Sequence, residues 1–162
     1  MEMVTVVALM AIMTTMAVSS LSPLRERTSL GHGAELVEQT LLNAHKRAMA
    51  TGRCMRVELL DAGGAVVASG ASALRLRRWS HAGCDGAADF DQAEHFALPL
   101  GVLAAAVAPP SDFDFLPNGR PRLMTGETQL RVAVAYLGRQ LWVDVTPAGA
   151  ICLKEDASGA CP

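Results

Sequence analysis

Aromatic side chains and net charge are both scarce in this chain of 162 residues. Aromatic residues make up 4% of the sequence, and the formal net charge is −2. The near-neutral balance argues against a generally basic surface that coats nucleic acid, and the shortage of aromatic rings weakens any proposal of base stacking. Apolar residues reach 51%, so a single small domain can still bury a core.

Catalytic fingerprints are also missing. The sequence contains no G-x-S-x-G, H-E-x-x-H, Walker or dinucleotide-binding motif. His81 and Cys84 could supply two metal ligands, but no second pair has suitable spacing, and a loop histidine beside a disulfide cysteine is the simpler interpretation. Acidic residues gather at 89–94 and at 112–114, where surface loops are commoner than paired catalytic acids or a calcium site. We therefore predict no enzyme activity, no metal and no cofactor.

No base precedes Arg25, although the chain opens on an apolar run. A secretory signal has a positively charged start and a small-residue cleavage site, and this segment has neither. The run from residue 3 to residue 21 is about long enough to span a bilayer as a helix. Its flanking acid is Glu2, which would cost about 2.5–3.5 kcal/mol at the centre of a membrane. An acid kept at this place is expected to have a partner of opposite charge.

A second helical pattern follows further along the chain. Pro23, Gly31 and Gly33 are expected weak points between the two patterns, because proline kinks or ends a helix and glycine costs up to about 1 kcal/mol in one. Thr51 and Gly52 end the second pattern. Its apolar residues recur at three- and four-residue spacing and predict one buried stripe: Ala34, Val37, Leu41, Ala44 and Ala48.

After residue 52 the apolar period shifts to two, which predicts antiparallel strands. A helix with one apolar stripe and a sheet with one apolar face can both bury these surfaces by packing against each other. We therefore predict an α+β layout in which a long N-terminal helix packs its second half on an antiparallel sheet while its first half protrudes. A loop is expected at 80–92, and strands at 55–60, 65–69, 72–79, 95–107 (one or two strands), 113–116, 130–136, 141–145 and 150–153.

The four cysteines form an even set: Cys54, Cys84, Cys152 and Cys161. If the apolar segment sends the rest of the chain across a membrane, these residues reach an oxidising compartment, where disulfides are expected. Three pairings are possible. We favour Cys54 with Cys84 and Cys152 with Cys161, the second of which closes a short loop, while free buried thiols are the alternative.

Four segments stand in a characteristic order. They are Glu2 with the apolar run behind it, LLNAHKRAMATG at 41–52, FDFLPNGR at 113–120 and WVDVTPAG at 142–149. In this order they resemble the type IV pilin superfamily, and in particular the GspH/FimT branch of minor pilins and pseudopilins. The last three segments are similar to the branch's helix end, its aromatic-x-Phe-x-Pro-x-Gly turn and its closing hairpin. The resemblance covers nearly the whole chain.

This resemblance implies three parts and a structural role. The parts are a transmembrane assembly helix at 1–22, an amphipathic continuation of this stalk at 23–52 and a periplasmic antiparallel β domain at 53–162. The chain would be a single-pass protein of the bacterial inner membrane that joins a type II secretion pseudopilus or a type IV pilus. Its partners would be other pilins or pseudopilins, bound through the N-terminal helix, and prepilin peptidase if a leader lies upstream of Met1. Glu2 would neutralise the N-terminal amine of a neighbour, since the two charges lower each other's cost of burial in lipid.

Two other functions stay open. Competence-type members of the branch resemble DNA binders through basic residues after the closing glycine, but the matching stretch here, GAIC at 149–152, has no arginine. Arg120 and Arg122 have the related spelling at the earlier turn and are the candidate DNA contacts, although we do not expect nucleic acid as a partner. A non-polymerising periplasmic adaptor is the second alternative. Further arginines could form a basic patch or a solvated strand face: Arg53, Arg75, Arg77 and Arg78.

Overall fold

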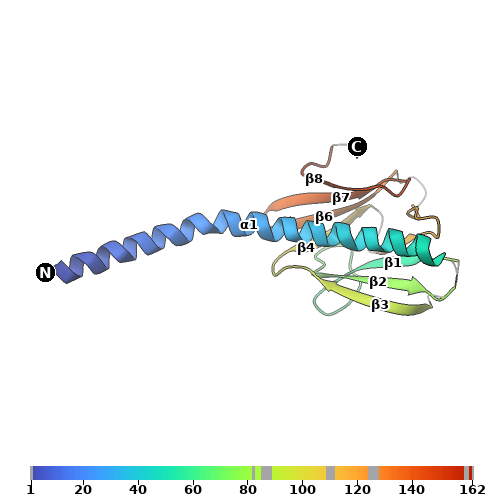
Figure 1. Cartoon of the computed structure of the whole chain (residues 1–162), viewed down its shortest axis with the longest axis horizontal. Helices are drawn as coiled ribbons and strands as arrows, with labels where there is room; N and C mark the ends of the chain where they lie inside the picture. The colour runs from blue at the N-terminus through green and yellow to red at the C-terminus, as the bar shows by residue number, and fades with distance from the viewer. Residues whose placement is uncertain are drawn as a thin grey trace.

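A computed structural model describes residues 2–81, 83–84, 89–108, 112–123, 128–158 and 161, with side chains from residue 25 onward except at 108. Helix α1 (Glu2–Thr51) opens the chain and projects far beyond the β domain with its N-terminal half (Figure 1). In the described residues it is followed by β1 (Met55–Leu60), β2 (Ala73–Trp79), β3 (Phe90–Ala97), β4 (Leu103–Ala108), β5 (Asp112–Phe115), β6 (Leu130–Tyr136), β7 (Arg139–Val145) and β8 (Ile151–Lys154). The predicted class, a long helix packed on antiparallel strands, is confirmed.

Helix α1 runs without interruption through Pro23, Gly31 and Gly33, so the predicted single long helix is confirmed and none of these expected weak points ends it. At Gly33 packing gives the reason for the glycine. A Cβ atom at this position would lie 2.6 Å from Cγ1 of Val102, which precedes β4. Glycine therefore lets the helix approach the β domain more closely than any other residue would.

The predicted apolar stripe is confirmed, since all five of its residues are 0% exposed. It packs against strands of both sheets and joins their side chains in one core. Leu41 lies at the centre of the stripe, where complete burial of a leucine contributes about 1.5–3 kcal/mol. Thr40 is the buried polar neighbour, and its hydroxyl donates to the carbonyl oxygen of Leu36 at 2.8 Å. The stripe thus fixes the second half of the helix without an unsatisfied polar group at Thr40.

The described strands divide between two antiparallel sheets, a division that the sequence pattern does not indicate. One sheet has the order β3-β2-β1-β5 and the other the order β4-β6-β7-β8. The expected strand at 65–69 forms only an isolated bridge from Val66 to Leu60. Beyond it, Ala71 exchanges two backbone hydrogen bonds with Ala104 of β4, at 2.9 and 2.8 Å. This segment therefore leads from the edge of one sheet to the edge of the other.

One further expectation about the strands needs correction. The predicted loop at 80–92 ends early, because β3 already begins at Phe90. The apolar stretch at 95–107, expected to hold one or two strands, contains two: the end of β3, a turn and β4. Gly101 lies in this turn with a φ of +81°, and a Cβ atom on it would lie 2.9 Å from Cε2 of Tyr136. The β3–β4 turn and the end of β6 are therefore in close contact.

The turn between β6 and β7 is strained. Tyr136 pairs with Arg139, and the two residues between them, Leu137 and Gly138, have φ values of 47° and 83°. Positive φ at both central positions defines a type I′ turn, which favours Asn-Gly. Leu137 is the one non-glycine residue with positive φ in the described part of the chain. A side chain without a local hydrogen-bonding group costs roughly 1–2 kcal/mol in this conformation.

Candidate functional site

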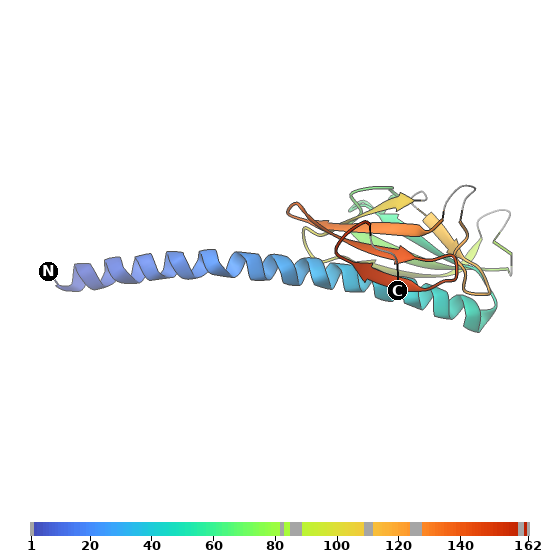
Figure 2. The same ribbon diagram turned by 90° about the horizontal axis from the view of Figure 1, so that it is seen from above.

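The proposed assembly element is the N-terminal half of α1. In both views it extends away from the β domain, and no strand lies beside it (Figures 1 and 2). The side chains of Glu2 and of the segment predicted to span the membrane, 1–22, lie outside the residues whose side chains are described. Within the part of the chain whose side chains are described, no helix combines the length and the apolar composition that a membrane span requires. The assembly role of Glu2 therefore stays a prediction.

The other three segments of the resemblance meet at one point, around His45 of α1. Nδ1 of His45 lies 2.8 Å from the carbonyl oxygen of Gly119, which belongs to the turn after β5. Gly119 and Gly149 both have positive φ, +80° and +89°. A Cβ atom on Gly149 would lie 2.8 Å from the Gly119 carbonyl oxygen and 3.0 Å from Cε1 of His45. The helix end and both turns therefore need these glycines in order to pack together.

Both favoured disulfides are present: Cys54 is bonded to Cys84, and Cys152 to Cys161. The first lies directly before β1 and forms a small apolar cluster with Trp79. Phe90 and Leu116 pack against this cluster. The disulfide therefore fixes the loop before β3 onto the start of β1 and the end of β2.

Removal of the Cys54–Cys84 disulfide should weaken the domain more than removal of the C-terminal one. For sequence separations of 30 and 9, loop-closure entropy gives losses of about 3.6 and about 2.6 kcal/mol in the free energy of unfolding. The measurement is urea unfolding of the full chain in detergent, followed by tryptophan fluorescence, for Cys54→Ser/Cys84→Ser and Cys152→Ser/Cys161→Ser. A larger loss in the free energy of unfolding for Cys152→Ser/Cys161→Ser than for Cys54→Ser/Cys84→Ser would contradict this prediction.

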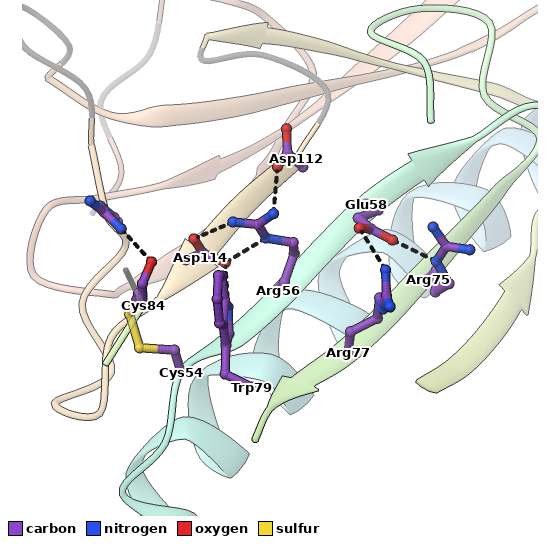
Figure 3. Close-up of polar contacts among 10 residues, drawn as sticks. Cys54, Arg56, Glu58, Arg75, Arg77, Trp79, Cys84, Asp112 and Asp114 are labelled. Atoms are coloured by element: carbon purple, nitrogen blue, oxygen red, sulfur yellow. Dashed lines mark hydrogen bonds and ion pairs between the residues drawn. A yellow bond between two sulfur atoms is a disulfide. The ribbon is translucent and has the colours of Figure 1, made fainter. Parts of the chain in front are cut away.

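Ion pairs cover the face of the β3-β2-β1-β5 sheet that points away from α1 (Figure 3). Asp114 of β5 accepts hydrogen bonds from Nε and Nη2 of Arg56, each at 2.9 Å, and from the indole nitrogen of Trp79 at 3.0 Å. Arg56 also reaches Asp112 at 3.2 Å. The hydrogen bonds from Arg56 to Asp114, helped by the nearby carboxylates, raise the pKa of this guanidinium despite its partial burial. The two aspartates are thus held by an arginine, and the candidate paired acids at 112–114 form part of a structural network.

The arginines of the candidate basic patch all have acidic partners. Arg75 and Arg77 of β2 bind Glu58 of β1, whose side chain is nearly buried (Figure 3). Arg53 and Arg78 share a single carboxylate, that of Asp91, with nitrogen–oxygen distances of 3.0 and 2.8 Å. These four guanidiniums share two carboxylates, and Arg56 with Asp112 and Asp114 brings the face to five cations and four anions. Such a small excess of positive charge offers little attraction to a phosphate backbone.

The two candidate DNA contacts differ in their surroundings. Arg120 is exposed in the turn after β5, where its backbone N–H donates to the side chain of Asn118 at 3.0 Å. Nη1 of Arg122 donates to the carbonyl oxygen of Cys84 at 2.7 Å. Arg122 therefore fastens the disulfide loop to the strand region after β5.

Among the described residues, no group of three metal-binding side chains lies close enough together to hold a metal ion.

A third buried carboxylate, after Glu58 and Asp114, lies in the other sheet and escaped sequence reasoning. Asp144 of β7 is 0% exposed. It accepts hydrogen bonds from Nε and Nη2 of Arg131 and from Nζ of Lys154, all at 2.7 Å. Burial acts to raise the pKa of Asp144, but these hydrogen bonds outweigh it and hold the pKa below its ordinary value of 3.8. The carboxylate therefore links three neighbouring strands, β6, β7 and β8.

Comparison with known proteins gives likeness in structure only. No protein-family model and no curated protein matches the chain. The type IV minor pilin FimU of Pseudomonas aeruginosa matches in two crystal forms. In the first crystal form, the TM-score is 0.58 at 18% identity, and the match covers 82% of this chain and 92% of the FimU chain. In the second, the TM-score is 0.52 at 16% identity, and the match covers 75% of this chain and 90% of the FimU chain. The minor pseudopilin EpsH of the Vibrio cholerae type 2 secretion system matches with a TM-score of 0.52 at 13% identity, over 80% of this chain and 99% of EpsH. This chain thus has the fold of minor pilins and pseudopilins.

Proposed function

We propose that the chain is a structural minor pilin or pseudopilin of the GspH/FimT type, which joins a type II secretion pseudopilus or a type IV pilus through its N-terminal helix. The observation that carries this proposal is the unequal covering of α1. Its second half buries a complete apolar stripe against the β domain, whereas its first half, rich in apolar residues, has no strand beside it. At 1.5 Å per residue, the whole helix is about 75 Å long.

An apolar helix of this kind needs either lipid or other helices around it. Before assembly the bilayer supplies that environment, and the β domain lies in the periplasm, whose oxidising conditions suit its two disulfides. In the filament, helices of neighbouring subunits replace the lipid through close packing. Prepilin peptidase is the processing partner if a leader lies upstream. We do not propose DNA binding, because each arginine of the β2 face is held in an ion pair with an acidic neighbour.

The chain should be recovered in filaments. We expect antibodies against the β domain to detect it, as a minor component, in filaments sheared from cells that express it with their own assembly machinery. Deletion of the gene should lower piliation or protein secretion, and the full-length chain should restore it. Exclusive recovery in the inner membrane, from cells that assemble normal filaments, would instead support the non-polymerising adaptor.

A further inference from the structure

One end of the β domain faces the N-terminal half of α1, and we call it the stalk end. It consists of the β3–β4 turn at 98–102, the β6–β7 turn at 136–139 and the adjoining helix residues 27–33. These parts are in contact, because Gly33 packs against Val102 and Gly101 against Tyr136. The β6–β7 turn, drawn in orange, reaches furthest along the helix toward its N-terminus (Figure 2).

Two exposed leucines stand on the turns of this end. Leu100 is 98% exposed at the tip of the β3–β4 turn, and Leu137 is 72% exposed in the β6–β7 turn. Leu137 occupies the first central position of a type I′ turn, where asparagine or glycine would fit the backbone with less strain. A large apolar side chain at a strained, exposed position points to a contact made by that side chain.

The surroundings of the two leucines are basic at the rim. Arg27 and Arg139 are exposed, form no ion pair with any described residue, and line one groove of about 620 Å³ together with Leu30 and Glu155. Arg25, two residues closer to the N-terminus, is exposed as well, and Glu26 is the other acid nearby. Apolar tips with a rim of arginines suit the interfacial layer of a bilayer, where such side chains meet acyl chains and phosphates.

The stalk end lies at the outer boundary of that layer, where long arginine side chains can reach the phosphates. The apolar run ends at about Leu21, and Arg27 follows six residues later, about 9 Å along a helix. The headgroup layer on each side of the hydrocarbon core is roughly 5–8 Å thick. Because Arg139 shares one groove with Arg27, Leu30 and Gly31, the β6–β7 turn lies level with this part of the helix.

We propose that the stalk end of the β domain rests on the phospholipid surface around the chain's own anchor, with Leu100 and Leu137 inserted among the headgroups and the arginines beside phosphates. This inference rests on the proposed function, because it requires the apolar run to lie in a membrane. It adds a second, peripheral membrane contact, which the subunit must release when it enters a filament.

The test is hydrogen exchange of the full chain in vesicles of phosphatidylglycerol and phosphatidylcholine. Replacing both leucines, as Leu100→Ser/Leu137→Asn, should speed exchange at 98–102 and 136–140 by roughly tenfold, since the inserted turns would return to water. Asparagine is favoured in the type I′ turn, so this variant should fold at least as well as the parent chain. Val107→Ser is the matched control: Val107 is 53% exposed toward the opposite end of β4, and its replacement should leave both turns protected.

The same data separate this inference from the anchor on which it rests. Slow exchange at residues 3–18 reports insertion of the apolar run. Protection there, together with equal exchange at the two turns in parent and variant, would overturn the membrane contact while the anchor stands. Fast exchange at residues 3–18 would overturn the anchor itself. Protection of the turns at a high but not at a low protein-to-lipid ratio would show that a second copy, rather than lipid, covers the leucines, and would also overturn the inference.

Discussion

Glu2→Ala is expected to abolish incorporation of the chain into a filament while leaving its insertion into the membrane intact. The side chain sits at the start of an apolar run, where a charged group is costly in lipid, about 2.5–3.5 kcal/mol if it lies centrally. Pairing with the N-terminal amine of a neighbour would remove much of that cost for both groups. Loss of the carboxylate leaves the amine without its partner, so the assembled state loses stability relative to the free subunit. The measurement is the amount of chain in sheared filaments compared with the amount in membranes.

The controls separate charge from bulk and from helix formation. Glu2→Gln keeps the size of the side chain without its charge, and we expect it to fail as Glu2→Ala does. Glu35→Ala removes an exposed acid from the second half of the same helix and should assemble normally. Parental amounts of the Glu2→Ala chain in filaments would show that packing of the apolar run suffices, with the glutamate stabilised by the helix dipole alone.

Asp144→Ala is expected to destabilise the β domain by about 3–5 kcal/mol, the usual loss when one partner of a buried ion pair is removed. The carboxylate is fully buried and holds Arg131 and Lys154, whose side chains are only 15% and 9% exposed. Without it, two cations remain close together with little water. Urea unfolding of the full chain in detergent gives the measurement. Asp91→Ala breaks the exposed pairs with Arg53 and Arg78 and should change the free energy of unfolding little. Equal losses of stability in the two variants would show that burial gives Asp144 no larger contribution than an exposed aspartate.

The same residue predicts how stability depends on pH. The pKa of Asp144 is lower in the folded chain than its ordinary value of 3.8, so the unfolded state binds more protons in this range. Its contribution is therefore complete above about pH 4 and is lost as the pH falls through the lowered pKa. Asp144→Asn should show a smaller drop in the urea midpoint between pH 5 and pH 2.5, about one unit or more on either side of 3.8. An identical drop in both proteins would assign the acid sensitivity to other carboxylates.

Local patterns in the sequence predicted the helix and most of the strands, because the periodicity of each element depends on residues close to one another in the chain. The stripe from Ala34 to Ala48 repeats with the period of a helix, and burial of all five residues follows from that period. The first part of β3 escaped because it is an edge strand in which half of the residues are polar, FDQAEHFA, and exposure hides the alternation of apolar residues. The division into two sheets escaped because it depends on pairings such as Ala71 with Ala104, which no local pattern records.

The chemistry of the site was predicted less completely than the fold. The even number of cysteines and the short loop between Cys152 and Cys161 were enough to favour the two disulfides that the structure contains. The roles of the acids were not accessible in the same way, since Asp112 and Asp114 meet Arg56 only after β5 has paired with β1. Asp144 likewise gains its cations from strands on both sides. Glu2 and the candidate DNA contacts remain predictions from the sequence.

The position of Cys54 has a mechanical consequence. Helix α1 and strand β1 run in opposite directions and are joined at the far end of the domain, where Cys54 follows the last helical residue by three positions (Figure 1). A tensile force on the helix would reach β1 at its first residue and peel the strand backward from there. The covalent bond to Cys84 stands at that starting point. Traction along a fibre would therefore meet a crosslink before it could open the first backbone hydrogen bonds of β1.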